Sequence, residues 1–180
     1  MKTETTFIDG LFVIHPRVFE DSRGYFYESW NRKTFGAAGI NADFVQDNQS
    51  LSQKNVLRGL HFQNPPHAQA KLVRVITGSV LDVVVDIRKN SPTYGKHFDV
   101  VLSEKNKLMF FIPEGFAHGF LTLEDNTLFS YKCAGYYNKN AEDTLLWNDP
   151  DIGIDWGATD PVLSEKDIAG KPFKNFVSQF

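Results

Sequence analysis

The sequence predicts an all-β protein, folded as an antiparallel sandwich or barrel with a few short helices, and three observations support that prediction. Short stretches of β-prone residues follow one another along the chain, with turn residues between them at regular intervals. Residues 80–87 alternate as a strand facing a core does. Sixteen phenylalanines would fill the space between two sheets. The length of 180 residues suits one domain with its own core, and we assign residues 1–180 to it.

Composition excludes several classes of function. The net charge is −3 and the basic residues are scattered, which argues against a nucleic-acid partner. No apolar run reaches membrane length, and residues 1–6 lack the apolar core of a signal peptide, so we expect no membrane association. The single Cys133 excludes an internal disulfide and a zinc site with several cysteines. One unpaired thiol fits the reducing cytoplasm, where we expect the protein to act.

The first half of the chain predicts strands and one helix. Residues 6–14 are expected to form an early strand, interrupted by a glycine and stopped by a proline. Residues 25–30 are β-prone, and Asn31 is expected to cap a short helix that runs through Ala38. Residues 44–60 are expected to be extended, with polar side chains on one side.

The strongest structural signal lies in residues 72–88. Two β-prone runs flank Thr77-Gly78-Ser79, which predicts a hairpin or a tight corner. In the second run, four aliphatic residues share one face, while Asp82, Asp86 and Arg88 share the other. Further strands are expected at residues 97–102, 108–112 and 129–137, and Asp167 is expected to begin or precede a last helical turn.

One cluster of residue types points to acid–base chemistry. Residues 58–63 bring an arginine and His61 together, and Lys71 follows ten residues after the histidine. An imidazole can take up a proton near neutral pH, and an ammonium can stabilise the negative charge that develops beside a carbonyl. With Tyr131 and Asp167 further along the chain, the set suggests proton abstraction from a carbon acid.

Residues 113–120 resemble the second conserved motif of cupins, Pro-x-Gly-x-x-His, with His118 as its histidine. The resemblance implies a cupin-type double-stranded β-helix, or jelly-roll barrel, with this histidine pointing inward. Metal-binding cupins add a His-x-His pair and a glutamate from a first motif. Residues 61–71 contain neither, so we expect no bound metal.

Several blocks together resemble the dTDP-4-dehydrorhamnose 3,5-epimerase family. They occur in the family's order and cover nearly the whole chain: residues 21–28, 58–61, 68–75, 86–88, 91–95, 112–120, 131–132 and 163–167. The resemblance implies an enzyme without metal or cofactor that epimerises C3 and C5 of dTDP-4-dehydro-6-deoxy-D-glucose in dTDP-L-rhamnose synthesis. It also implies a homodimer in which the subunits exchange N-terminal strands.

By this resemblance, four residues act at the reaction centre. His61 would be the general base, and Asp167 would hold its tautomer. Lys71 would stabilise the enolate, and Tyr131 would return a proton on the opposite face. The residues alone leave other roles open: a core histidine, a helix-capping acid, a strand-edge lysine and a packed core tyrosine.

The remaining candidates would bind the substrate. His118 would line the sugar pocket and rivals His61 as the base, while Tyr137 rivals Tyr131 as the acid or forms a wall of the pocket. The other candidates, which would contact the nucleotide and its diphosphate, are Arg23, Phe26, Glu28, Gln46, Asn48, Arg58, Glu142 and Lys166. Arg58 and His61 have opposite parity on a regular strand, and a bulge at Gly59 would re-aim one of them.

Three other functions stay open at this point. An epimerase acting at one carbon, or an isomerase of a related dTDP-hexulose, would share these residues. A cupin that binds a sugar nucleotide without catalysis would need only the binding set. A metal-dependent cupin, such as an oxygenase or a phosphosugar isomerase, would need ligands that the motif comparison does not find.

Overall fold

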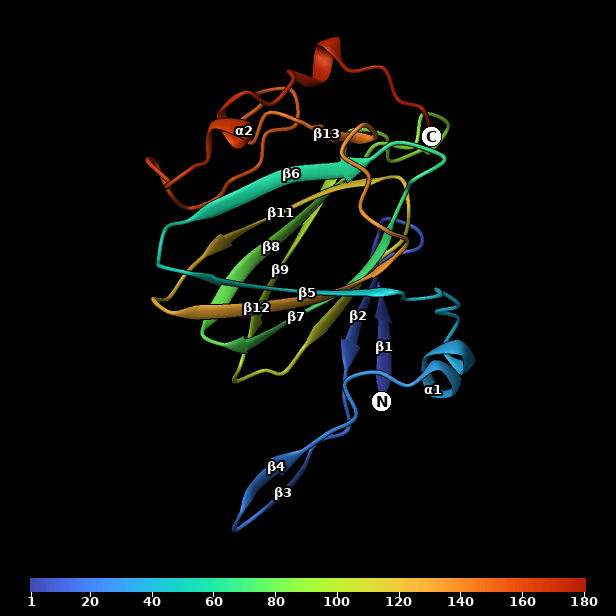
Figure 1. The fold of residues 1–180 in the computed structure, drawn as a ribbon, viewed down its shortest axis with the longest axis vertical. Helices are drawn as coiled ribbons and strands as arrows, with labels where there is room; N and C mark the ends of the chain where they lie inside the picture. The colour runs from blue at the N-terminus through green and yellow to red at the C-terminus, as the bar shows by residue number, and fades with distance from the viewer.

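Two antiparallel sheets face each other in the computed structural model, which describes residues 1–180, and a hairpin projects away from them (Figure 1). From edge to edge, the six-stranded sheet holds β1 (Lys2–Thr5), β2 (Phe12–His15), β10 (Met109–Ile112), β7 (Ala70–Thr77), β12 (Thr127–Ala134) and β5 (Gln46–Ser52). The five-stranded sheet holds β13 (Glu142–Thr144), β6 (Leu57–Gln63), β11 (Phe116–Thr122), β8 (Ser79–Asp86) and β9 (His97–Ser103). The hairpin consists of β3 (Phe19–Asp21) and β4 (Gly24–Phe26), and the helical elements are α1 (Arg32–Ala37), α2 (Glu165–Ile168) and a 3₁₀ turn at Phe173–Asn175. The predicted all-β class is confirmed.

Apolar side chains fill the space between the sheets and also cover one outer face. Phe129 of the six-stranded sheet meets Val84 and Phe120 of the other sheet in one buried cluster. The rings of Phe120 and Phe129 stack with their centroids 4.2 Å apart. On the outer face of the five-stranded sheet, Val83 packs with Trp156 of the C-terminal segment. Strand β8 is therefore buried on both faces, and fully burying each such aliphatic side chain contributes roughly 1.5–3 kcal/mol.

The segment Thr77-Gly78-Ser79 is a corner between the sheets. Strands β7 and β8 on either side of it belong to different sheets, so the hairpin alternative is wrong. Gly78 has a φ of +81°, and a Cβ placed on it would lie 2.3 Å from Oγ1 of Thr127. Only glycine fits this corner, because a side chain would meet both the backbone strain and the clash.

Helix α1 begins where the sequence predicts. The side chain of Asn31 accepts hydrogen bonds from the backbone N–H groups of Lys33 and Thr34, as an N-cap residue does. Phe35 is the buried residue of this short helix, and its ring packs against Trp30. The predicted cap and helix are confirmed.

Two predicted strands have other limits, and two stretches expected to be β-prone or extended are strands only in part. Residues 6–14 are mainly the turn between β1 and β2, in which Oγ1 of Thr6 accepts the N–H of Ile8. Residues 25–30 are extended only as far as β4, and residues 44–60 contain two strands with a turn between them. The predicted strand at 129–137 ends at β12's Ala134, because Gly135 turns the chain at a φ of +131°.

No helix of the structure is both long and apolar enough to span a membrane.

Candidate active site

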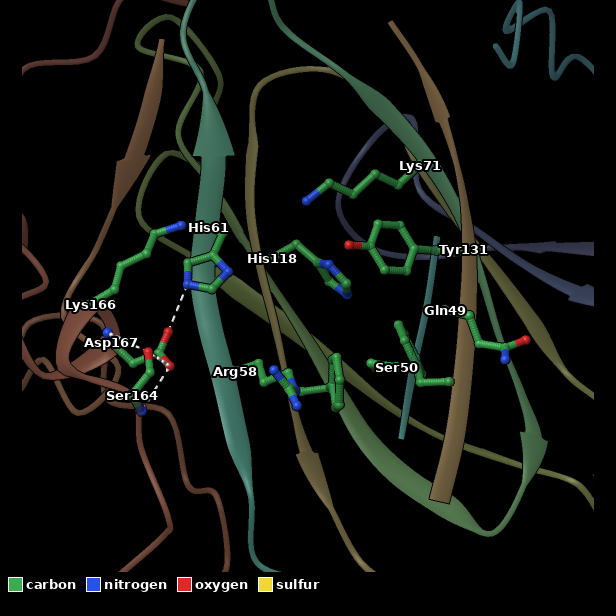
Figure 2. A pocket seen from close by; sticks show the side chains of 12 residues that line it. Gln49, Ser50, Arg58, His61, Lys71, His118, Tyr131, Ser164, Lys166 and Asp167 are labelled. Carbon is green, nitrogen blue, oxygen red and sulfur yellow. Dashed lines mark hydrogen bonds and ion pairs between the residues drawn. The ribbon is translucent and has the colours of Figure 1, made fainter. Parts of the chain in front are cut away.

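A cavity of about 340 Å³ opens between the two sheets (Figure 2). Its walls come from both sheets and from α2: Gln49, Ser50, Arg58, His61, Lys71, His118, Phe120, Phe129, Tyr131, Ser164, Lys166 and Asp167. A second hollow of about 310 Å³ adjoins it and shares His61, Lys71 and Tyr131 as lining residues. The predicted reaction-centre residues thus line one cavity, although they lie more than 100 positions apart in the sequence at the extremes (61 and 167).

The imidazole of His61 is held by a hydrogen bond with Asp167. Its Nε2 lies 2.6 Å from Oδ1 of Asp167. Since a carboxylate can only accept, Nε2 carries the hydrogen and donates it, which leaves Nδ1 as the proton acceptor. The other ring nitrogen points into the cavity in Figure 2. Burial lowers the pKa of His61, although the hydrogen bond with Asp167 opposes this effect, so the imidazole is neutral at pH 7.

Asp167 is fixed by a local motif of α2. It occupies the third helical position of a capping box whose N-cap is Ser164. Its Oδ1 also accepts the N–H of Gly59 at 3.1 Å, and its Oδ2 accepts the Ser164 hydroxyl at 2.6 Å. Burial alone would raise the pKa of Asp167, but the hydrogen bonds from His61, Ser164 and Gly59 lower it to about 2. The group is a carboxylate at any working pH.

A bulge in β6 turns Arg58 and His61 toward the same cavity. His61 pairs with His118 of β11, but Arg58 pairs with Phe120, so β6 carries one residue more than β11 over this stretch. Gly59 permits it: a Cβ there would lie 2.5 Å from Cα of Gly119. The predicted bulge is confirmed, and both side chains line the cavity.

Lys71 and Tyr131 face His61 from the opposite sheet. Lys71 is the second residue of β7, and Tyr131 lies on the neighbouring strand β12, opposite Val73 and two positions along from Lys71. Both polar ends point into the cavity in Figure 2. Burial lowers the pKa of Lys71 and raises that of Tyr131. Tyr131 therefore keeps its phenolic proton at neutral pH and has one to donate.

His118 forms a second histidine–carboxylate pair at the back of the cavity. Its Nε2 lies 3.0 Å from each carboxylate oxygen of Asp82, which is fully buried. Burial raises the pKa of Asp82, although His118 and Lys71 oppose that rise.

The residues of the chain form no cluster of three or more histidine, cysteine or acidic side chains with the arrangement of a metal site.

Four of the predicted substrate-binding residues surround the second hollow. Gln46 and Asn48 of β5 are hydrogen-bonded to each other at 2.9 Å. The hydroxyl of Tyr137 donates to Oε2 of Glu142 at 3.1 Å, and Oε1 of Glu142 pairs with Lys166. Tyr137 lies beyond the end of β12 with 54% of its surface exposed, so the parity that related it to Tyr131 does not apply.

Three predicted binding residues lie away from the cavity. Arg23 and Phe26 are exposed on the projecting β3–β4 hairpin, which extends away from both sheets (Figure 1). Arg23 is paired with Asp21 at 2.6 Å. Glu28 is exposed and accepts a hydrogen bond from Asn31. Within one chain, the structure does not bring this group to the reaction centre.

Sequence reasoning missed five lining residues. Gln49 and Ser50 lie on β5, and Phe120 and Phe129 form an aromatic floor. The fifth is Ser164, whose Ser-x-x-Asp spacing is the signature of a capping box and could have identified it.

The fold and the cavity define the class of protein, a cupin-like jelly roll with an acid–base site between its two sheets. A crystal structure of dTDP-4-dehydrorhamnose 3,5-epimerase from Elizabethkingia anophelis superposes with a TM-score of 0.93 at 50% identity, covering 97% of each chain. A dTDP-6-deoxy-D-glucose-3,5-epimerase from Legionella pneumophila, in complex with dTDP-4-keto-L-rhamnose, gives a TM-score of 0.94 at 47% identity and covers 98% of this chain and 94% of that one.

Comparison of sequences leads to the same family. The dTDP-4-dehydrorhamnose 3,5-epimerase from Shigella flexneri is 52% identical over 174 residues, which are 96% of this chain and 94% of the relative. The family model for dTDP-4-dehydrorhamnose 3,5-epimerase matches residues 5–175. The chain belongs to the dTDP-4-dehydrorhamnose 3,5-epimerase family.

Proposed function

We propose that this chain inverts C3 and C5 of dTDP-4-dehydro-6-deoxy-D-glucose and forms dTDP-4-dehydro-L-rhamnose for dTDP-L-rhamnose synthesis. One observation carries the proposal: the imidazole of His61 on one sheet faces the phenol of Tyr131 and the amine of Lys71 on the other, across one cavity. Inversion at carbon needs a base and an acid on opposite faces of the sugar, and this arrangement supplies both.

In the proposed reaction, each proton that leaves the sugar is replaced by another, so no net charge is formed. Nδ1 of His61 removes the proton from C3, and the electron pair moves into an enolate whose negative charge rests on the C4 oxygen. Lys71 stabilises that oxygen, and burial strengthens the interaction. Tyr131 then donates its proton to C3 from the other face, and exchange with solvent resets both groups. The same sequence at C5 completes the double inversion.

The substrate's nucleotide and diphosphate would occupy the second hollow and the cavity entrance. Arg58 and Lys166 supply positive charge beside the reaction centre, and an arginine fork suits phosphate oxygens. Gln46 and Asn48 offer amide groups for the nucleoside. No metal or cofactor enters any of these steps.

A homodimer accounts for the exposed hairpin. We propose that Arg23, Phe26 and Glu28 act on the nucleotide in the partner subunit's cavity, with N-terminal strands exchanged between the subunits' sheets. Support comes from the exposure of Phe26, at 70%, and of Phe19, at 51%, on an element without contacts to its own cavity. Isolated two-stranded hairpins are marginally stable in water, so such an arm is expected to dock on a partner subunit.

We place the enzyme in the cytoplasm, where a free Cys133 stays reduced.

Solvent exchange in D₂O tests the proposed reaction. The protein is mixed with dTDP-4-dehydro-6-deoxy-D-glucose, and deuterium at each carbon is counted by mass spectrometry and NMR. We expect label at both C3 and C5 in an inverted product. Label at one carbon alone would assign the chain to single-site epimerases, and tight binding without any exchange would assign it to non-catalytic binding proteins.

The base assignment needs a separate variant. His61→Asn removes the proton acceptor but keeps a polar side chain, and we expect exchange to fall about 10²–10⁴-fold while dTDP still binds. A variant that retains turnover would remove His61 from this role. Activity that disappears with a chelator and returns with iron, zinc or manganese would instead indicate a metal-dependent cupin.

A further inference from the structure

The partner of the proposed base comes from a segment outside both sheets. Helix α2 is a single turn, and its N-cap Ser164 and its Lys166 are exposed, whereas only 2% of Asp167 is exposed. Parallel bridges pair Val162 with Val56 before the helix, and Lys171 with Leu145 after it. The orientation of Asp167 therefore depends on how this short turn holds the carboxylate, because no strand carries it.

Ser164 makes three hydrogen bonds with Asp167. Its hydroxyl and its backbone N–H both donate to Oδ2, at 2.6 and 3.2 Å, and its Oγ accepts the N–H of Asp167 at 3.3 Å. Oδ2 is thereby occupied on the helix side. Oδ1 is left to accept from His61 at 2.6 Å and from the N–H of Gly59 at 3.1 Å. The carboxylate plane is fixed by donors on both oxygens, and Figure 2 shows Ser164, Asp167 and His61 in line.

We propose that Ser164 is a positioning residue for His61, whose hydroxyl sets the orientation and the proton affinity of the imidazole by acting through Asp167. The inference rests on the proposed epimerisation. A donor on Oδ2 draws negative charge away from Oδ1, and a less basic Oδ1 stabilises the imidazolium less. Removing the Ser164 hydroxyl should therefore raise the pKa of His61 and make its imidazole ring more mobile.

A substitution of Ser164 leaves the other charged and titratable groups near His61 unchanged. They are Lys166 of α2, Lys71 of β7, Glu142 of β13, Arg58 of β6, His118 of β11 and Tyr131 of β12. A change confined to Ser164 thus isolates the effect that its hydroxyl has on His61 through Asp167.

Three substitutions separate positioning from helix capping. Glycine is nearly as good an N-cap as serine, whereas alanine is a poor one. Ser164→Gly removes the hydroxyl donor to Asp167 and largely keeps the helix cap, Ser164→Ala removes both the hydroxyl and the cap, and Ser164→Thr keeps both. If the hydroxyl positions the base, the glycine and alanine variants behave alike in catalysis and differ in stability.

We expect kcat/KM to fall about fivefold in Ser164→Gly and Ser164→Ala, the size of one net hydrogen bond, with KM unchanged. The acidic limb of the pH profile of kcat/KM should move to higher pH in both variants, and Ser164→Thr should restore it. Ser91→Gly is the matched control, because Ser91 donates to Asp86 at the same 2.6 Å, at a turn that does not line the cavity. Ser91→Gly should leave the acidic limb of the kcat/KM profile at its wild-type pH.

NMR titration of the His61 imidazole tests the inference without any substrate. An upward shift of the His61 pKa in Ser164→Gly supports positioning even if the wild-type protein proves to have another activity. A wild-type titration and pH limb in Ser164→Gly, with only a lower unfolding temperature in Ser164→Ala, would mean that Ser164 only caps α2, and the proposal would fail. Failure of Ser164→Thr to restore the titration would also overturn it.

Discussion

One physical effect, burial, prepares both the proposed base and the proposed acid for their roles. Both are partly buried, and burial favours the neutral form of each group: it lowers the pKa of His61 and raises that of Tyr131. A neutral histidine can accept a proton and a neutral tyrosine can donate one. At neutral pH the cavity therefore contains a ready base and a ready acid without any change of state.

Loss of the phenol should separate proton removal from inversion. In Tyr131→Phe we expect deuterium to enter from the His61 side while the inverted product forms about 10²–10⁴-fold more slowly, because no acid serves the other face. Product stereochemistry and label are read together by NMR. Tyr94→Phe is the control, since this tyrosine packs on Phe173 outside the cavity. If Tyr137→Phe shows the inversion defect and Tyr131→Phe does not, the acid is Tyr137.

The Asp167 carboxylate should make stability depend on pH in the acidic range. Its pKa is about 2 in the folded chain against an ordinary 3.8, so the unfolded chain binds more protons and stability is lost as pH falls from about 4 toward 2. Between pH 5 and pH 3, the free energy of unfolding of Asp167→Asn should fall about 1 kcal/mol less than that of the wild type.

Urea unfolding at pH 5, 4 and 3 measures this difference. Asp21→Asn provides the same chemical change on the solvent-exposed hairpin, where screening weakens the effect of charge, and it should keep the wild-type pH dependence. Equal slopes for wild type and Asp167→Asn would contradict the expectation.

At the scale of elements, the contact between β6 and β11 decides where the proposed base, His61, lies. A Cβ on Gly119 would lie 2.8 Å from the carbonyl oxygen of Arg58 and 3.0 Å from Cα of Gly59. Gly119 has no positive φ, so its need for glycine is steric alone. The absence of side chains on both strands at this point lets the bulge bring His61 and Arg58 to one side.

Gly119→Ala should separate these strands. We expect a loss of about 1–3 kcal/mol in the free energy of unfolding, the usual range for overpacking, together with lower activity. Gly36→Ala is the contrasting variant. Gly36 lies within α1, and a Cβ there would meet only the flexible end of the Asn41 side chain, 3.3 Å away. There alanine should stabilise by about 0.5–1 kcal/mol. Chemical denaturation of both variants makes the comparison, and equal stabilities would contradict the steric argument.

What the sequence predicts well at this scale is local. The alternation of β8, the Asn31 cap and the bulge at Gly59 each follow from neighbouring residues, and each is confirmed. The bounds of β2 do not, because a strand extends as far as its partner does, and β10, which pairs with β2, is distant in sequence. Short β13 is missed for the same reason: it exists by pairing with β6.

The same division holds for the site. His61, Lys71 and Tyr131 are recognisable from residue type and motif, and the structure gathers them in one cavity with Asp167. Their facing arrangement depends on which sheet each strand joins, which local periodicity cannot tell. The parity argument for Tyr137 fails at Gly135, where the strand ends.

At the scale of the whole molecule, the proposed dimer makes each active site a shared structure. Arg23 and Phe26 lie on a hairpin that projects from the barrel (Figure 1), so their proposed role requires a second chain. A closed two-fold dimer would supply two such sites, each with the cavity of one subunit and the arm of the other.

Subunit complementation tests this sharing. His61→Asn and Arg23→Ala chains should each be weakly active alone. After mixing and subunit exchange, about a quarter of wild-type activity should return, because half of the dimers are mixed and each has one site with both residues intact. Sedimentation equilibrium checks the dimer itself. Mixing without recovery, in dimers shown to exchange, would place the arm and the cavity of one site on the same subunit.

The order of the chain has a consequence for how the protein becomes active in a cell. The last strand of the two sheets ends at Thr144, whereas α2 begins at Glu165. A ribosome therefore releases the complete set of strands before it releases Asp167. A newly made chain can therefore pair all of these strands before the carboxylate of Asp167 is available to the imidazole of His61.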